Sequence, residues 1–428
     1  MGRNRTSTKT GLSVMLCVLC LVFNAWAPQP VARSFSRDHS SLVSTTTVEG
    51  RLAVFDDVWE TIQQRYYDPK FHGVDWQAKR NVFRPAAAAA SGTHEFYELL
   101  RQMIGSLKDA HTRVYSPDEK FDWWNPRFIT VGLGIREVEG VPTVIQIEPG
   151  SAAAQTDIRP GDVITKIDDL PVADLLAKRP GPMHSRTIAN IFDGPAGTSV
   201  KVEWTTRNGK QKSAVLQRYW AQRQLGFSNQ RKGKIAVLRI DAFTQTVALE
   251  FSKSLPDVLE GAAGIILDLR ANGGGDAEAM ADVASLFLDE GINLGKFADR
   301  YGASFELQTY SKRLWRTPQL GPVKLPIVVL TSETTSSAAE ILAAALQSKG
   351  RARVIGTGTC GCVLAIRNRH ALPDGGVLDV SEFDYRTAGG VRLEGAGIKP
   401  DELSPLKRSD IYSRRDRTLE RALDSLKQ

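Results

Sequence analysis

The segment that decides the fold runs from residue 325 to residue 350 and reads LPIVVLTSETTSSAAEILAAALQSKG. Residues 327–330 form an apolar run of the kind found in a strand buried on both faces of a sheet. Residues 338–349 have the apolar period of a helix, and Gly350 supplies a common helix stop. The polar segment between them predicts a tight turn from strand to helix that ends at Ser337.

Ser337 stands where the predicted helix begins. The first N–H groups of a helix and its dipole favour negative charge, so a serine there can act as a nucleophile whose anionic intermediate is stabilised. The same serine also fits a purely structural role, because Ser337-Ala-Ala-Glu340 matches a helix capping box. The segment alone leaves both interpretations open.

The composition bounds the size and the class of the protein. Its 428 residues favour about two or three domains. An apolar content of 42% is enough for a sizeable core, and the net charge of +7 comes from dispersed basic residues. The sequence contains no block of Lys and Arg and no alternation of aromatic with basic residues, which argues against a nucleic-acid partner.

Residues 1–27 have the parts of a secretory signal peptide: a basic start, an apolar run over residues 12–23 and a small-x-small cleavage site, Ala25-Trp26-Ala27. The apolar run is too short to favour a membrane span, so we expect no stable span after the signal is removed. Residues 28–46 are polar and predict a linker. These features predict an exported protein, periplasmic or extracellular.

The cysteines argue against disulfides and metals. Cys17 and Cys20 fall within the signal segment, which leaves Cys360 and Cys362 in the mature chain. Two residues apart, this pair is poorly placed for a mutual disulfide. A metal or redox site would need more ligands or a C-x-x-C spacing. We therefore expect two small buried residues, no disulfide, no metal and no cofactor.

The region between the linker and residue 120 predicts a small helical domain, spanning residues 47–120. An apolar stripe with the helical period runs through residues 50–67, and a second helical pattern begins near Thr93. The domain ends in Lys-Asp-Ala-His-Thr, which puts His111 at the close of the helical region.

Residues 121–222 change to short β-branched runs separated by turns. The segments GLGI (132–135), EPGSAAA (148–154) and RPGDVI (159–164) occur in an order that closely resembles a PDZ domain. The resemblance implies a loop and a strand edge that take up a peptide C-terminus by β-addition. The implied peptide-binding residues are Gly132, Leu133, Gly134 and Ile135. The alternative is a β domain that only spaces its neighbours.

Residues 223–428 have an α/β pattern. An apolar strand pattern over residues 264–270 leads into Asn-Gly-Gly-Gly at 272–275, and a helix follows. Glycines after a strand let the backbone turn its N–H groups towards a ligand. The Gly-Lys-Ser/Thr of a P-loop does not follow them, which argues against a nucleotide.

Taken together, the motifs resemble one enzyme family. The helical start, the PDZ segment, LDLRANGGG (267–275), TSSAAEILAAAL (335–346) and LEGAGIKPD (393–401) follow the order of the C-terminal processing peptidases and their tricorn-like relatives, the S41 serine peptidases. The resemblance implies a multidomain α/β protein with an N-terminal helical domain, a PDZ β domain and a crotonase-like (ClpP/crotonase-type) α/β catalytic core. It also implies that Ser337 is the nucleophile.

The general base is where this chain departs from the better-known branch of that family. That branch uses a lysine shortly after the serine, and Cys362 stands at its position here. The tricorn-like branch uses histidine and glutamate instead. His111 and Glu394 match these, and Glu394 lies 57 residues beyond Ser337 (394 − 337). His370 is the strongest competitor for the role of base.

A Ser337–His111–Glu394 triad is chemically sufficient. The imidazole takes the serine proton and returns it to the leaving amine, and the carboxylate fixes the tautomer of the ring. The resemblance points to the N–H groups of Gly274 and Ala338 as the oxyanion hole.

We therefore predict an exported serine endopeptidase of protein or peptide substrates, in which the PDZ domain binds or gates substrate C-termini. One rival is a non-catalytic PDZ-containing binding protein on a decayed peptidase scaffold. The other is a peptidase that recruits a lysine base from elsewhere in the chain.

Overall fold

The computed structural model describes residues 42–119, 127–177, 191–192, 194–222, 225–310 and 322–427. The expected signal peptide over residues 1–27 lies outside these ranges, and so does most of the expected linker. Within the described ranges, no helix combines the length and the apolar character needed to cross a membrane.

The N-terminal region consists of α-helices whose inward faces form one hydrophobic core. They are α1 (Val48–Arg65), α2 (Trp76–Ala89) and α3 (Thr93–Gly105), with the short 3-10 turns η1 (Phe71–Gly73) and η2 (Pro117–Glu119). Thr47 caps α1 by accepting the Gly50 N–H at 3.1 Å. The periodic apolar residues that predicted these helices are buried, among them Phe55, Ile62, Phe96 and Leu100. The helical prediction for this region is confirmed.

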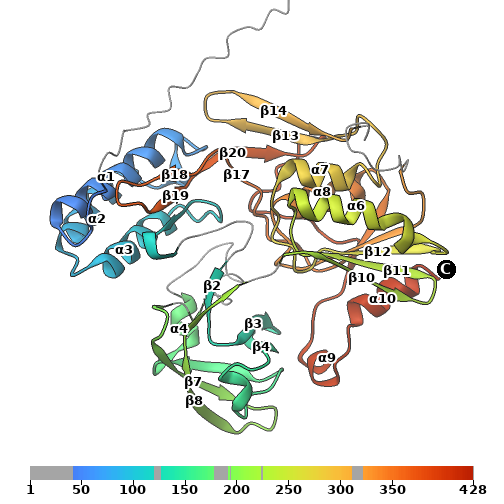
Figure 1. The fold of residues 1–428 in the computed structure, drawn as a ribbon, viewed down its shortest axis with the longest axis horizontal. Coiled ribbons are helices and arrows are strands. Elements are labelled where there is room, and N and C mark those ends of the chain that lie inside the picture. The colour runs from blue at the N-terminus through green and yellow to red at the C-terminus, as the bar shows by residue number, and fades with distance from the viewer. Residues whose placement is uncertain are drawn as a thin grey trace, which may run out of the picture. The chain divides into compact units, whose positions relative to one another are not determined.

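A small sheet joins this core to the C-terminal half of the chain. β1 (Arg113–Tyr115) pairs antiparallel with β19 (Val377–Asp379), which also pairs with β18 (His370–Ala371). Leu372, Leu378 and Val380 belong to the same hydrophobic cluster as the helices. Figure 1 shows β18 and β19, drawn in orange-red, beside the blue helices. The segment that carries His111 is therefore held between early and late parts of the sequence.

The second region is a β domain. Its sheet has the order β3-β4-β5-β7-β8, and β6 (Leu170–Pro171) pairs with β5. The strands are β3 (Leu133–Val138), β4 (Val141–Ile147), β5 (Val163–Ile167), β7 (Ser199–Thr205) and β8 (Gln211–Gln217). The short helices η3 (Ala153–Gln155) and α4 (Val172–Ala177) accompany them, and a ribbon of β2 (Arg127–Thr130) and β9 (Tyr219–Gln222) connects the domain to the rest of the chain. Among the described strands, β3 pairs with β4 alone, so one of its edges is open.

The third region is built on a sheet with the order β10-β11-β12-β15-β16-β21. Its strands are β10 (Phe227–Lys232), β11 (Ile235–Ile240), β12 (Gly264–Asp268), β15 (Ile327–Thr331), β16 (Ala352–Gly356) and β21 (Glu402–Leu403). All neighbours pair in parallel except β10 with β11. Every residue of β12 and β15 is buried, as their continuous apolar runs predicted.

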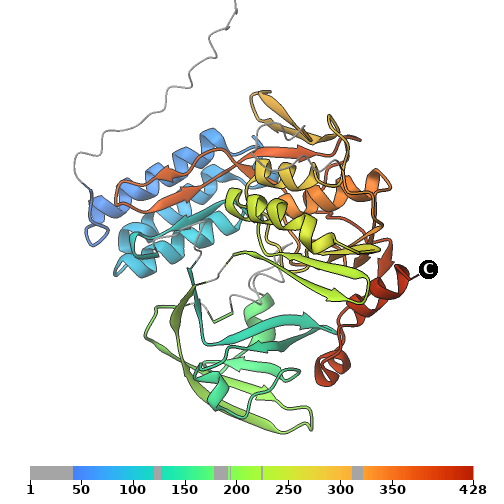
Figure 2. The same cartoon turned by 45° about the vertical axis from the view of Figure 1, so that its right-hand side comes forward.

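Helices cover both faces of this sheet (Figures 1 and 2). The helices α6 (Gln245–Leu259), α7 (Ala277–Ala284) and α8 (Ala338–Ser348) share a core with Leu238, Ile265 and Val329. On the opposite face, Ala422 of α10 (Arg417–Ser425) packs with Ile266 and Val328. The alternation of neighbouring residues between the two cores is the period-2 geometry of a strand.

Further elements complete this third region. A second sheet has the order β14-β13-β20-β17, formed by β13 (Asn293–Asp299), β14 (Ser304–Gln308), β17 (Ala365–Ile366) and β20 (Ser381–Arg386). The helix α9 (Arg408–Ser413) precedes α10. Because β12 and β15 are parallel neighbours, the glycine-rich loop after β12 and the turn before α8 meet at the same edge of the main sheet.

Candidate active site

Ser337 occupies the turn between β15 and α8, as predicted, and its backbone is strained. Its φ is 57° and its ψ is −127°, a region that non-glycine residues rarely occupy. Its N–H donates to the carbonyl oxygen of Cys362 (2.8 Å) and to Oε2 of Glu340 (3.0 Å). No side-chain hydrogen bond from Ser337 caps the helix. The local hydrogen bonds therefore fix the backbone of the serine without engaging its hydroxyl group.

Glu340 is the fully buried carboxylate that holds this turn together. Its Oε1 accepts from Thr359 Oγ1 (2.5 Å) and the Gly361 N–H (2.8 Å). Its Oε2 accepts from the Cys362 N–H (2.9 Å) as well as from Ser337. Burial raises the pKa of this carboxyl group, and these hydrogen bonds act in the opposite direction. Glu340 thus forms its half of the predicted capping box and also ties the start of α8 to residues 359–362.

Gly274 lies against Ser337, where only glycine fits. Its φ is +95°, and a Cβ at this position would lie 2.5 Å from the Cβ of Ser337 and 2.9 Å from the Ser336 carbonyl oxygen. The same point lies 3.1 Å from the Ala338 nitrogen, the first of α8. The Gly274 N–H donates to Oδ1 of Asn272 at 2.8 Å. The two N–H groups expected to donate to the oxyanion are thus neighbours, and that of Gly274 is already hydrogen-bonded to Asn272.

His111 is buried, with 8% of its surface exposed, and its Nδ1 has no hydrogen-bond partner among the described residues. The pKa of its imidazole is lowered to about 4, mainly by burial and also by the charge of Arg113, while the charge of Asp109 acts in the opposite direction. The ring is therefore neutral at ordinary pH and able to accept a proton.

Asp109 fixes the backbone that carries His111. Its Oδ1 accepts from the N–H groups of His111 and Thr112, both at 2.7 Å, and from the Ser381 hydroxyl at 2.9 Å. Its Oδ2 accepts from the Thr112 hydroxyl at 2.8 Å. This is a side-chain-closed turn that is also anchored to β20. The local signal was the Asp-x-His spacing, which the sequence analysis did not use.

Glu394 lies beside the segment that follows the cysteines. Its Oε2 accepts the N–H groups of Val363 (2.7 Å) and Leu364 (3.1 Å). The pKa of its carboxyl group is raised to about 7, mainly by burial and also by the charge of Asp109. The two hydrogen bonds and the charge of Arg392 act in the opposite direction.

The three predicted catalytic side chains do not form a closed hydrogen-bond chain among the described residues. Ser337 and Glu394 are tied to successive parts of the 362–364 segment. His111 is tied to Asp109, whose charge acts on both His111 and Glu394. Hydrogen bonds in a resting catalytic site often tighten only when substrate binds. The competitor His370 bonds through Nε2 to Asp57 of α1 at 2.7 Å, which gives it a structural partner.

The expectation of two unpaired cysteines was wrong. Cys360 and Cys362 form a disulfide, and their Cα atoms lie 5.2 Å apart, within the normal range for a bridged pair. The reason is the residue between them: Gly361 has a φ of +67°, which folds the backbone into a turn instead of extending it. The prediction that they are buried holds for Cys362, which is 1% exposed, whereas Cys360 is partly exposed.

The predicted peptide-binding segment lies at the start of the open edge strand β3. Gly132 has a φ of +84°, and a Cβ there would lie 2.3 Å from the Cβ of Ser151. Leu133 and Ile135 are buried in the core of the β domain. Gly134 and the next residue carry a bulge in the pairing with β4.

An ion pair links this strand to the turn that carries Ser337. Nε of Arg136 donates to Oε1 of Glu333 at 2.6 Å, and Glu333 precedes Ser337 in the turn after β15. The Thr357 hydroxyl also donates to Glu333, at 3.3 Å. Sequence reasoning missed this contact because its partners belong to different domains.

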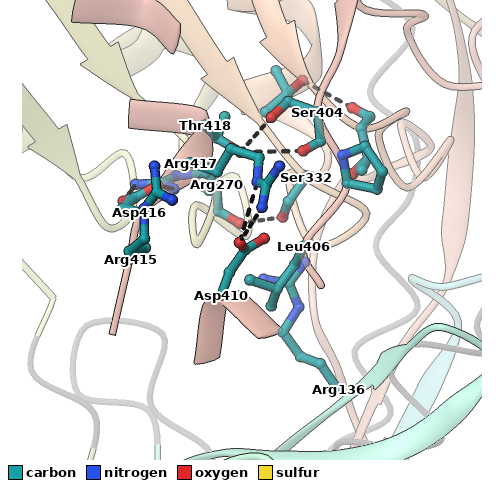
Figure 3. Close-up of a pocket in the computed structure, with 13 residues that line it drawn as sticks. Arg136, Arg270, Ser332, Ser404, Leu406, Asp410, Arg415, Asp416, Arg417 and Thr418 are labelled. Carbon is teal, nitrogen blue, oxygen red and sulfur yellow. Dashed lines mark hydrogen bonds and ion pairs between the residues drawn. The ribbon is translucent and has the colours of Figure 1, made fainter. Parts of the chain in front are cut away.

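Arg136 also lines a cavity of about 220 Å³ (Figure 3). The cavity walls are charged but internally paired: Arg270 bonds to Asp416 at 2.7 and 2.8 Å, and Arg417 bonds to Asp410 at 2.8 Å. The residues around the cavity do not include the three predicted catalytic side chains. In the part of the chain that the structure describes, no group of three or more His, Cys, Asp or Glu residues is placed to hold a metal ion.

Comparison with known proteins agrees with this architecture. The family described as peptidase family S41 matches residues 234–404, the tricorn protease C1 domain matches residues 49–105, and the PDZ domain matches residues 130–216. The third region of the chain thus matches peptidase family S41. Together with its carboxyl-terminal-processing relatives, this match shows that the protein is a serine-type peptidase.

Relatives and solved structures extend the match over most of the chain. The carboxyl-terminal-processing protease of Picosynechococcus sp. is 28% identical over 99% of this chain and 97% of its own, and that of Synechocystis sp. is 29% identical over 86% and 85%. Among solved structures, the photosystem II D1 C-terminal processing protease has a TM-score of 0.54 at 24% identity, covering 84% of this chain and 93% of its own. Mature CPAF has a TM-score of 0.66 at 15% identity, covering 89% and 97%. These likenesses confirm the predicted fold class.

Proposed function

We propose that this peptidase cleaves protein substrates near their C-termini, with Ser337 as nucleophile, His111 as general base and Glu394 as the carboxylate partner of His111. The observation that carries the proposal is the strained, hydrogen-bonded backbone of Ser337 at the start of α8, which leaves its hydroxyl uncommitted. Relatives named carboxyl-terminal-processing proteases support the substrate class.

The reaction begins with proton transfer from the serine. The imidazole of His111, kept neutral by burial, accepts the proton of Ser337 Oγ after the two groups come within hydrogen-bond reach. The alkoxide attacks the scissile carbonyl, and His111 then gives the proton to the departing amine. A water molecule repeats the sequence to release the acyl group.

The oxyanion formed in each step is bound by backbone donors. The Ala338 N–H has no partner within the helix because it is the first of α8. The Gly274 N–H becomes available once it leaves Oδ1 of Asn272, which holds it at 2.8 Å. Loss of one oxyanion donor typically raises the barrier by about 3 kcal/mol, so this exchange is part of activation.

The β domain selects the substrate end. An extended peptide adds to the open edge of β3, where main-chain hydrogen bonds supply affinity. The ion pair between Arg136 and Glu333 connects that strand to the turn before Ser337, so peptide binding and the nucleophile can influence one another. Peptides with a free C-terminus should bind more tightly than the same peptides with an amidated C-terminus.

Export of the protein is part of the proposal. The composition of residues 1–27 supports it, and so does the Cys360–Cys362 disulfide, because disulfides persist mainly in oxidising compartments. Export should be visible as a mature chain that starts near Pro28 in the envelope or medium fraction. Its alternative outcome is an uncleaved chain in the cytoplasm.

The decisive experiment is labelling with a fluorophosphonate probe, which reacts with activated serines. The wild type should be labelled, and Ser337→Ala should abolish the reaction while the protein stays folded. Absence of labelling in the wild type, together with retained peptide binding, would replace the enzyme by a peptide-binding protein. Labelling that survives His111→Ala but not the loss of a lysine would instead identify a lysine base.

A further inference from the structure

The segment that contains the disulfide forms one wall of the nucleophile's surroundings. The Cys362 carbonyl oxygen accepts the Ser337 N–H (2.8 Å), and the Cys360 N–H donates to the Thr335 carbonyl oxygen (3.0 Å). The next contacts involve two carboxylates: the buried Glu340 accepts the Cys362 N–H, and the partly buried Glu394 accepts the two N–H groups that follow. The cysteine pair is therefore bonded on both sides to groups that set the site.

The bridge is a poor stabiliser of the whole fold. A disulfide stabilises a protein largely by closing a loop in the unfolded chain, and the effect grows with loop length. Cys360 and Cys362 are two positions apart, which is close to the shortest loop possible. Its constraint is thus local, on a turn that touches the nucleophile.

The two cysteines differ in their exposure to solvent. Cys360 is partly exposed, whereas Cys362 is 1% exposed. A thiolate from solution would attack Sγ of Cys360, and Cys362 would be the leaving group. Access and the identity of the attacked sulfur control the rate of such exchange.

We propose that Cys360–Cys362 is a thiol-exchange site, opened by a dithiol reductant, whose reduction slows acylation of Ser337. The effect on acylation rests on the proposed function, but the redox state of the pair does not. In the first step, a reductant thiolate forms a bond to Cys360 Sγ, and the bond between the two cysteines breaks. Cys362 leaves as a thiolate and takes up a proton.

The second thiol of the reductant completes the reaction. It attacks the mixed disulfide and releases Cys360, which also takes up a proton, while the reductant closes to its own disulfide. Overall, two electrons and two protons pass from the dithiol to the cysteine pair. An oxidised dithiol or another disulfide can run the reaction in reverse.

Reduction acts on the nucleophile because two thiols cannot remain at bonding distance. The turn through Gly361 must widen, and this displaces the Cys362 carbonyl oxygen from the Ser337 N–H and the adjoining N–H groups from Glu340. Ser337 then loses one of the two hydrogen bonds that its N–H makes while its φ is held at 57°. We expect fluorophosphonate labelling of the reduced protein to be at least about five-fold slower, a change of roughly one kcal/mol in the barrier.

The test uses the full chain with Cys17→Ser and Cys20→Ser, so that only the pair can react. Mass spectrometry after alkylation should find no accessible thiol in the protein as isolated and two after treatment with dithiothreitol. The labelling rate should fall on reduction and recover on reoxidation. The matched control adds Cys360→Ser and Cys362→Ser, and it should be slow and unresponsive to dithiothreitol.

Amide hydrogen exchange gives a second reading that needs no catalysis. Exchange over residues 335–341 should be faster in the reduced protein. Two alkylated thiols in the protein as isolated, or equal exchange and equal labelling in both redox states, would overturn the proposal. If no state is labelled while the exchange difference remains, the peptidase proposal fails and the exchange site stands.

Discussion

The proposed nucleophile, Ser337, and the proposed base, His111, differ in how firmly the structure holds them. At Ser337, the backbone N–H and the carbonyl oxygen are both hydrogen-bonded, and the buried Glu340 accepts bonds from four groups around it. At His111, the backbone is fixed by Asp109, but Nδ1 of the ring has no partner among the described residues. The serine is thus preorganised and the imidazole is not. The difference implies that the resting site still lacks a positioned His111 ring.

The largest effect should come from removing that base. His111→Ala should lower the rate of fluorophosphonate labelling by about 10³-fold, because general-base assistance typically contributes two to four orders of magnitude. His94→Ala is the matched control, since His94 is exposed on α3 and should leave the rate unchanged. Near wild-type labelling of the His111 variant would remove this residue from the mechanism and direct the search to a lysine.

The next largest effect tests the surroundings of Ser337, which the structure holds more firmly than those of His111. Glu340→Gln keeps the shape of the side chain but turns one acceptor oxygen into a donor that faces the N–H groups around it. It should lower the free energy of unfolding by about 1–3 kcal/mol and slow labelling as well, because buried donors lose their partner. Chemical denaturation measures the first quantity. The same change at Glu250, exposed on α6, should leave both unchanged, and equal results for the two variants would show that the turn does not depend on Glu340.

The two halves also differ in how far the sequence could predict them. The surroundings of Ser337 follow from one continuous stretch, in which an apolar strand, a polar turn and a helix specify each other locally. The disulfide could not be predicted from the sequence because it depends on the positive φ of Gly361, which the spacing of the cysteines does not reveal. The roles of Asp109 and Arg136 depend on Ser381 and Glu333, which lie far away in the sequence. Such pairings come from tertiary packing, and a local pattern carries no signal for them.

A smaller effect concerns the pH dependence of the site. The pKa of His111 is lowered to about 4, so its protonation should not limit the rate near neutrality. The pKa of Glu394 is raised to about 7, chiefly by burial, so its carboxylate forms only as the pH rises through that value. If the charged form is needed to stabilise the protonated imidazole, the labelling rate should rise with pH through about 7.

The variant Glu394→Gln tests whether the rise of the labelling rate near neutral pH, called the neutral limb below, comes from this carboxyl group or from another one. The variant should be about 10–100-fold slower at pH 8, and its labelling rate should no longer rise through neutrality, because the titrating group is gone. A profile that keeps its limb near pH 7 in the variant would assign the titration to another group. An unchanged rate would remove Glu394 from the triad.

The smallest effect tests whether Asp109 acts on the base by charge as well as by geometry. Asp109→Asn retains an oxygen that can accept the N–H groups of His111 and Thr112, but it removes the negative charge. That charge raises the pKa of Glu394 and also of His111, so both pKa values should fall in the variant. The limb near neutrality should move to lower pH, and the maximal rate should change by less than about ten-fold. Ser381→Ala removes a hydrogen bond to the same carboxylate (2.9 Å) without changing its charge, so it should leave the limb in place. A slower Asp109→Asn enzyme with an unshifted limb would mean that Asp109 only holds the backbone of His111.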